Sequence, residues 1–150
     1  KLSANASLTH DCPYHGIFMT STASKNAERF LHILNLDGFE KKFRIKDKGE
    51  FLFDGHEFLL GKKDGVMLPL NLRVGNVTIL YSTSEVIEVK EDSISFRLTQ
   101  TEDVIAFAAQ TDVKPSQDYK VDRQKDKVIV KSCKHFCADD CFTVHFGSLQ

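Results

Sequence analysis

This sequence of 150 residues lacks several features that would define a function. No apolar run approaches the roughly 18–20 residues of a transmembrane helix, so we expect no membrane-spanning segment within the chain. The formal net charge is only −1, which provides no broad basic surface, so nucleic acid is not an expected partner. The motifs G-x-S-x-G, H-E-x-x-H and G-x-G-x-x-G and the phosphate loop are also absent. We therefore expect a protein that is not an enzyme and has no cofactor.

Tryptophan is absent as well, and the apolar residues that replace it favour β-structure. Phenylalanine occurs twelve times, beside many valine, isoleucine and threonine residues that suit the half-buried surface of a sheet. A chain of this length matches one ordinary domain and buries roughly 68–70% of its unfolded surface. We therefore expect a single β-rich domain over residues 1–150.

After Gly38, apolar and polar residues alternate in several short segments. Alternation places successive side chains on opposite faces of a strand. Residues typical of turns separate the segments about every ten to twelve residues, and such short connections favour antiparallel hairpins. The segments are KKFRIKD, VTILYS, VIEVKE, SISFRLT and CFTVHFG. We expect about seven to nine strands in an antiparallel sandwich or irregular barrel.

One segment before Gly38 has helical spacing. Ser24 is a suitable N-cap, and Asp37-Gly38 is a suitable stop. Between them, apolar residues recur three and four positions apart at Ala27, Phe30, Leu31 and Leu34. The spacing predicts one N-terminal amphipathic helix of about three turns.

Near the end of the chain, Cys133, Cys137, Cys141 and His145 lie four residues apart from one another. A zinc ion needs its ligands within about 2–2.3 Å. The four residues would extend over about 18 Å in a helix, and a strand would leave Cys141 and His145 about 13 Å apart. Neither element surrounds one ion with all four. A zinc site that combines the cysteines with histidines from different segments is an alternative, and these histidines are His10, His15, His135 and His145.

Disulfide bonds are the simpler interpretation of the four cysteines. An even number of cysteines can pair fully, and the turn residues Ala138 to Asp140 permit a local bridge. Cys12 would then pair with Cys133, Cys137 or Cys141, and all three pairings remain open. Disulfide bonds persist in oxidising compartments, so this interpretation also predicts where the protein resides.

Two sequons agree with a passage through the secretory pathway. Asn5-Ala6-Ser7 and Asn76-Val77-Thr78 match the N-glycosylation pattern, so Asn5 and Asn76 are candidate sites. The chain begins at Lys1 instead of methionine, which favours a processed protein or a fragment of a larger one. We expect an extracellular or lumenal location.

The residues that could perform chemistry lack the context for it. Cys12 lies between His10 and His15, but no signature of a cysteine hydrolase accompanies the three. Carboxylates such as Asp54 and Glu57 lie in turn contexts typical of solvated surface groups.

We therefore predict a disulfide-stapled, non-enzymatic domain that binds another protein. It would belong to the ectodomain of a secreted, cell-surface or viral-surface glycoprotein. One alternative is a carrier of small hydrophobic ligands with a β-barrel cavity. The other is a Cys/His zinc-binding domain.

Overall fold

The computed structural model describes residues 6–8, 17–23, 28–47, 49–100, 102–132 and 140–147. The chain divides into two compact units. Unit 1 comprises residues 1–23 and 30–67, and unit 2 comprises residues 24–29 and 68–150. The single β-rich domain expected over residues 1–150 stays a prediction.

The fold is mainly β, as the alternating sequence predicts. The described residues form fifteen strands, and every described register is antiparallel. The largest sheet has seven strands in the order β13-β14-β12-β9-β8-β3-β2. The strands outnumber the seven to nine expected because several consist of only two or three residues, and because the expected strand KKFRIKD is divided into two.

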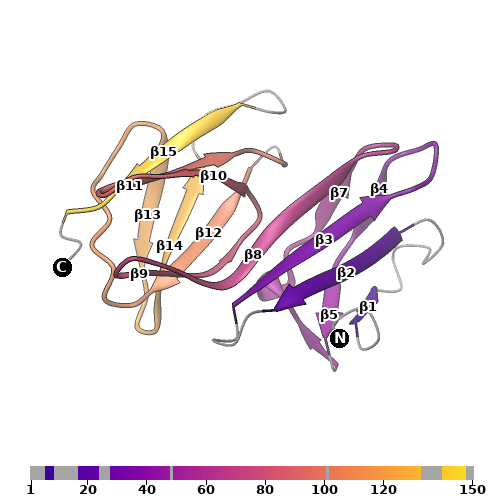
Figure 1. Ribbon diagram of the computed structural model, residues 1–150, viewed down its shortest axis with the longest axis horizontal. Coiled ribbons are helices and arrows are strands. Elements are labelled where there is room, and N and C mark those ends of the chain that lie inside the picture. Colours follow the sequence, from indigo (N-terminus) through magenta and orange to yellow (C-terminus); the bar gives the residue numbers. More distant parts are fainter. Residues whose placement is uncertain are drawn as a thin grey trace. The chain divides into compact units, whose positions relative to one another are not determined.

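Unit 1 contains two small sheets of short strands, together with β2 and most of β3 (Figure 1). The smaller sheets have the orders β1-β5-β6 and β4-β7, while β3 and β2 belong to the seven-stranded sheet. The elements are β1 (Ala6–Leu8), β2 (Ile17–Ala23), β3 (Arg29–Asn35), β4 (Lys41–Phe43), β5 (Ile45–Asp47), β6 (Glu50–Phe51), a 3-10 turn η1 (Phe53–Gly55) and β7 (Phe58–Leu60). Strand β8 (Gly65–Val74) continues from unit 1 into unit 2.

Unit 2 is a sandwich of two sheets. Sheet I contains β13-β14-β12-β9-β8, and sheet II contains β10-β11-β15. The strands after β8 are β9 (Val77–Ser82), β10 (Glu85–Val89), β11 (Ser93–Arg97), β12 (Val104–Ala108), β13 (Tyr119–Arg123), β14 (Lys127–Ser132) and β15 (Cys141–His145).

The core of unit 2 draws its side chains from both sheets. Sheet I contributes residues such as Ile79 and Phe107, and sheet II contributes residues such as Phe96 and Phe142. Phe96 stacks on Phe142, with ring centroids 5.7 Å apart. Aromatic pairs of this kind add about 0.5–1.5 kcal/mol to the stabilisation that burial provides. The phenylalanine-rich composition therefore fills the space between the two sheets.

The predicted N-terminal helix is wrong. Residues 29–35 form strand β3, and residues 24–27 lie outside the described residues. Leu31, Ile33 and Asn35 are all buried, with the period of two that a strand imposes. Because Asn35 is polar, the sequence does not show an apolar residue at the last buried position of this alternation. The helical spacing of Leu31 and Leu34 is coincidental.

Single alanine substitutions distinguish the strand from the helix. A helix with Leu31 and Leu34 on its apolar face would lose stability at both positions. In the structure Leu31 is 0% exposed and Leu34 is 42% exposed. We expect Leu31→Ala to lower the free energy of unfolding by about 2–5 kcal/mol, and Leu34→Ala to cost less than half as much. Urea denaturation measures both, and equal losses would contradict the strand.

Candidate interaction surface

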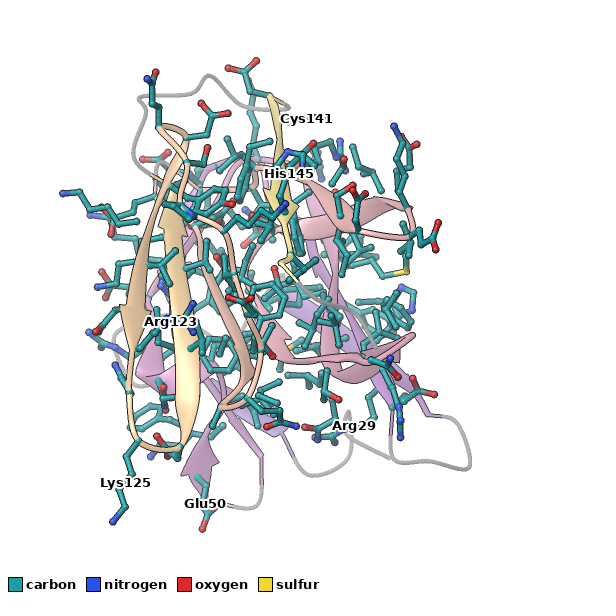
Figure 2. The ribbon with its side chains drawn as sticks, turned by 90° about the vertical axis from the view of Figure 1, so that its left-hand side faces the viewer. Arg29, Glu50, Arg123, Lys125, Cys141 and His145 are labelled. Carbon is teal, nitrogen blue, oxygen red and sulfur yellow. The ribbon has the colours of Figure 1, made fainter. Side chains whose placement is uncertain are left out.

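The last strand confirms one prediction from the sequence and leaves another open. Phe142, Val144 and Phe146 are buried, whereas Cys141 and His145 are exposed on the other side of the strand (Figure 2). This is the alternation that the sequence predicts for CFTVHFG. Cys12, Cys133 and Cys137 lie outside the described residues, so the predicted disulfide bonds stay a prediction.

Glycosylation at Asn5 and Asn76 and the alternative of a zinc site both stay predictions. Asn76 is exposed in the turn between β8 and β9, and Asn5 lies outside the described residues. Within residues 6–8, 17–23, 28–47, 49–100, 102–132 and 140–147, no group of three or more His, Cys, Asp or Glu residues could hold a metal ion. His10, His15 and His135 are not among them, so the alternative of a zinc-binding domain stays untested.

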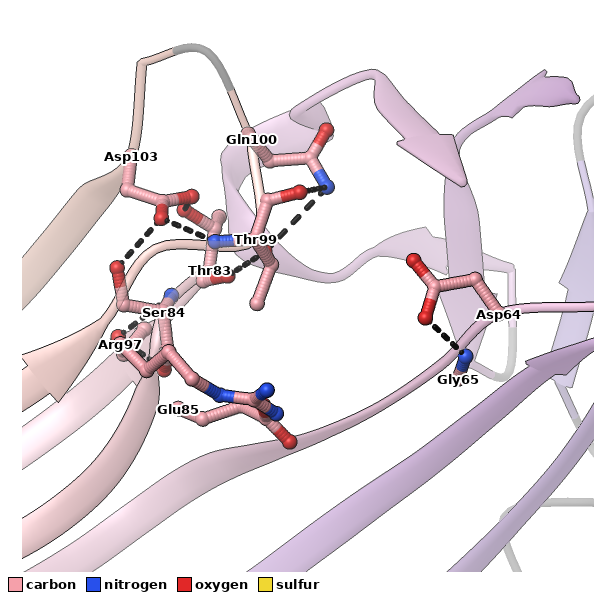
Figure 3. A network of polar contacts seen from close by, with 10 residues as sticks. Asp64, Gly65, Thr83, Ser84, Glu85, Arg97, Thr99, Gln100 and Asp103 are labelled. Carbon is pink, nitrogen blue, oxygen red and sulfur yellow. Dashed lines mark hydrogen bonds and ion pairs between the residues drawn. The ribbon is translucent and has the colours of Figure 1, made fainter. Parts of the chain in front are cut away.

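Unit 2 contains a buried carboxylate that the sequence does not predict. Asp103 is 0% exposed and lies immediately before β12. Its Oδ1 accepts a hydrogen bond from the Thr83 hydroxyl at 2.6 Å, and its Oδ2 accepts one from the Ser84 hydroxyl at 2.6 Å (Figure 3). Oδ2 also accepts the backbone N–H of Thr99 at 2.8 Å. The backbone N–H of Asp103 donates to the Ser132 hydroxyl at 3.0 Å.

These bonds make Asp103 a structural clamp and not a catalytic acid. Burial raises the pKa of its carboxyl above the ordinary value near 3.8 and outweighs the hydrogen bonds from Ser84, Thr83, Thr99 and Gln100, which lower it. Both carboxylate oxygens are engaged within the chain, and the side chain does not reach solvent. A substrate therefore has no access to it.

The raised pKa predicts how stability depends on pH. Between pH 3.8 and the raised value, the native state binds more protons at Asp103 than the unfolded state does, so the free energy of unfolding falls as pH rises. Asp103→Asn removes this term. We expect the difference in unfolding free energy, wild type minus variant, to decrease by up to about 1.4 kcal/mol per pH unit in this window.

Urea denaturation at a series of pH values measures that difference. Carbon-13 NMR of the Asp103 carboxyl gives the pKa directly in the wild type, so the prediction survives a poorly folding variant. A carboxyl that titrates below pH 3.8, or a difference that grows with pH, would show that the hydrogen bonds outweigh burial.

In unit 1, a buried amide joins two loops. The loop between β3 and β4 (residues 36–40) and the loop between β7 and β8 (residues 61–64) together form what we term the loop pair. Asn35 is 1% exposed, and its Nδ2 lies 2.9 Å from the carbonyl oxygen of Phe39 and 3.1 Å from those of Leu60 and Gly61. Its Oδ1 accepts the backbone N–H of Asp37 at 3.1 Å. One side chain thus fixes the backbone of both loops.

Further bonds hold the loop pair together. The backbone N–H of Asn35 donates to the carbonyl of Asp64 at 2.8 Å, and that of Lys63 donates to the carbonyl of Asp37 at 3.2 Å. The Lys63 ammonium also donates to the carbonyl of Leu36. Lys63 has a φ of 54°, a left-handed conformation that costs a non-glycine residue energy and that this network of bonds maintains.

The fixed loop pair exposes large apolar side chains. Leu36 is 52% exposed and Phe39 is 59% exposed, although both lie in the loop that Asn35 anchors. The buried ammonium of Lys41 pairs with Asp37 and lies 5.1 Å from the centre of the Phe39 ring. A cation at this distance from a ring face attracts the ring, so Phe39 is held in place on its solvent-exposed side of the loop. Leu36 and Phe39 form the candidate interaction surface.

Unit 2 also contains a cavity of about 260 Å³. It opens between the β8–β9 turn and the β10–β11 turn, and Val74, Asn76, Val89, Ile94 and Phe146 are among the residues that line it. Pockets for drug-sized ligands occupy about 300–1,000 Å³. The cavity is therefore small for a lipid, and the alternative of a hydrophobic-ligand carrier stays a prediction.

Comparison with known proteins finds no family model that matches the chain and no curated protein similar to it in sequence. The described residues contain no helix long and apolar enough to cross a membrane. The site must therefore be judged on its own geometry.

Proposed function

We propose that the chain is a non-enzymatic protein-interaction domain and that it binds its partner through Leu36 and Phe39. The observation that carries this proposal is their exposure on a loop whose backbone is fixed by Asn35. An apolar side chain on a mobile loop can bind a partner only when the loop backbone becomes ordered, which costs conformational entropy. Here that cost is already met by folding, so more of the contact energy is available for binding.

The chemistry of the loop pair indicates the kind of partner. Aromatic side chains at the centre of an interface contribute most to binding energy, and Phe39 is the most exposed large apolar residue among those described. The loop pair and the residues next to it in sequence expose three lysines and two acidic residues. The lysines are Lys42, Lys62 and Lys63, and the acidic residues are Glu40 and Asp64. A protein surface with an apolar depression bordered by carboxylates would complement this arrangement.

Site-specific crosslinking tests this surface. The chain carries a photoreactive benzoylphenylalanine at position 39 and is exposed to the surface of cells that bind it. We expect one discrete crosslinked protein, because the partner covers this position. An excess of wild-type chain should abolish the crosslink, and an excess of Phe39→Ser chain should not.

Position 51 is the matched control, because Phe51 is also a phenylalanine of unit 1 and is 48% exposed. The same probe there should give no crosslink to that protein. Equal crosslinking from positions 39 and 51 would refute the proposed surface. A crosslink to a second copy of the chain, with loss of a dimer in sedimentation of Phe39→Ser, would instead identify self-association.

The proposed setting is a secreted, cell-surface or viral-surface glycoprotein. Its support remains the sequence: four cysteines that can pair, and sequons at Asn5 and Asn76. Cys12, Cys133, Cys137 and Cys141 would form two disulfide bonds. The segment that holds Cys133 and Cys137 follows Ser132 and precedes Asp140, and both of these residues bond to the chain between β11 and β12.

The intact mass of the natively expressed protein tests this setting. Without reduction and under denaturing conditions, we expect a polypeptide mass that lacks about four hydrogen atoms and takes up no thiol-alkylating reagent, together with the added mass of a glycan. Reduction should expose all four cysteines to the reagent. Four alkylated cysteines before reduction, without a glycan, would refute the extracellular setting.

A further inference from the structure

We propose that Asn76 carries an N-linked glycan whose first N-acetylglucosamine binds in the cavity of unit 2. The inference rests on the proposed function, because only a chain in the secretory pathway receives such a glycan. It adds a binding site for a sugar attached to the chain itself. Two independent features meet at this position: the Asn76-Val77-Thr78 sequon and the cavity that Asn76 lines.

The turn between β8 and β9 places Asn76 at the cavity. Val74 and Val77 are paired across the two strands, so only Gly75 and Asn76 form the turn. Gly75 has a φ of 59°, which glycine adopts without strain and which permits so tight a connection. Asn76 is exposed, whereas Val77 is 2% exposed. A group joined to the Asn76 amide therefore begins at the protein surface beside apolar walls.

Strand β10 of the neighbouring sheet supplies part of those walls through Val89, two residues after a β-bulge at Ile87. The register of β10 against β11 pairs Val86 with Phe96 and Val89 with Ile94, and one extra residue lies between Val86 and Glu88. Cross-strand partners share a face of the sheet, so Val89 lies on the same face as Ile94, which is 2% exposed. Val89 itself is 48% exposed. The apolar core is thus left open at Val89, and the cavity is this opening.

The size and chemistry of the cavity suit one sugar. N-acetylglucosamine has an apolar ring face and an acetyl methyl group, which complement Val74, Val89 and Ile94. Its hydroxyl groups require polar partners, and Lys90 and Glu91 at the lining provide a donor and an acceptor. The volume of about 260 Å³ is below that of pockets for larger ligands, so the rest of the glycan would extend into solvent.

The attachment uses the ordinary donor of the secretory pathway, a lipid-pyrophosphate-linked oligosaccharide. The amide nitrogen of Asn76 forms a bond to C1 of the first sugar while the bond from C1 to the pyrophosphate oxygen breaks. The lipid pyrophosphate leaves with that electron pair, and the transferase takes the proton that the amide nitrogen loses. No oxidant or reductant is needed.

The full chain, preceded by a cleavable signal peptide, tests the inference in cells that attach only high-mannose glycans. The signal peptide delivers the chain whatever its native location, so occupancy of Asn76 is a property of the sequon. We expect glycopeptide mass spectrometry to find Asn76 occupied in the wild type and in Thr78→Ser, and unoccupied in Thr78→Ala. An unoccupied Asn76 in the wild type would overturn the inference.

Trimming the glycan tests whether the first sugar is bound. Endoglycosidase H leaves one N-acetylglucosamine on Asn76. We expect this form to keep a Tm about 2–4 °C above that of the unglycosylated chain, a shift typical of one modest interaction in a domain of this size. We also expect nuclear Overhauser contacts from the acetyl methyl group to the methyl groups of Val89. A trimmed form with the Tm of the unglycosylated chain and no such contacts would overturn the binding.

Two tryptophan variants on one strand provide the matched comparison. Val89→Trp fills the cavity, so we expect it to abolish the Tm shift while leaving Asn76 occupied. Ile87→Trp lies in the bulge of the same strand, where Ile87 is 50% exposed and does not line the cavity, and should retain the shift. Loss of the shift in both variants would refute the cavity as the binding site. None of these results depends on Phe39, so the inference and the proposed interaction surface fail separately.

Discussion

The sandwich of unit 2 depends on the buried carboxylate of Asp103. The described parts of the connections between the two sheets meet there: residues 83–84 lead from β9 to β10, and residues 98–100 and 102–103 belong to the connection from β11 to β12. The third connection leaves β14 at Ser132, which bonds to the backbone of Asp103. A chain that leaves one sheet for another loses its ladder partners, and buried backbone groups without partners are costly. Asp103 and the hydroxyls around it supply those partners.

In unit 1 the neutral side chain of Asn35 supplies hydrogen-bond partners to the backbone of connecting segments, and it does so mainly as a donor. Around Asp103 the surrounding groups are donors, namely two hydroxyls and a backbone N–H, so an anionic acceptor fits. Around Asn35 the groups near Nδ2 are carbonyl oxygens, so an amide donor fits. The two residues are similar in size, and their surroundings decide which of them can be buried. In each case a single polar side chain determines the paths of several connections.

The parts of this structure that depend on neighbouring residues were predictable from the sequence. Alternation correctly predicts that Phe142 and Val144 are buried and that Cys141 and His145 are exposed. Asp103 was not predictable, because its partners Thr83 and Ser84 lie about twenty positions earlier and TQTED resembles a solvated turn. The cluster YSTSE is a local signal, since its five consecutive hydroxyl or acidic residues at the end of a buried strand need hydrogen-bond partners.

The error at β3 has the same origin. Leu31 and Leu34 satisfy the spacing of a helix, but the alternation of Leu31, Ile33 and Asn35 is completed only by an amide whose partners come from residues 39, 60 and 61. A polar residue at a buried strand position is unfavourable without such partners, so its place in the alternation cannot be recognised from the segment alone. The same amide fixes the loop that exposes Phe39, so the sequence does not predict the candidate interaction surface either.

The two ends of the sandwich in unit 2 differ because of where its connections run. Strands β9, β11, β12 and β14 each begin or end at the Asp103 clamp, while β8 joins β9, and β10 joins β11, at the other end by turns within one sheet. Turns of that kind satisfy their own backbone groups but do not bridge the two sheets. At that end the β12–β13 connection reaches sheet II, through the bridge between Val113 and Phe146, and it leaves Val89 uncovered. An apolar opening beside Asn76 is thus a consequence of the topology, and a sugar bound there would close the core that the strand connections leave open.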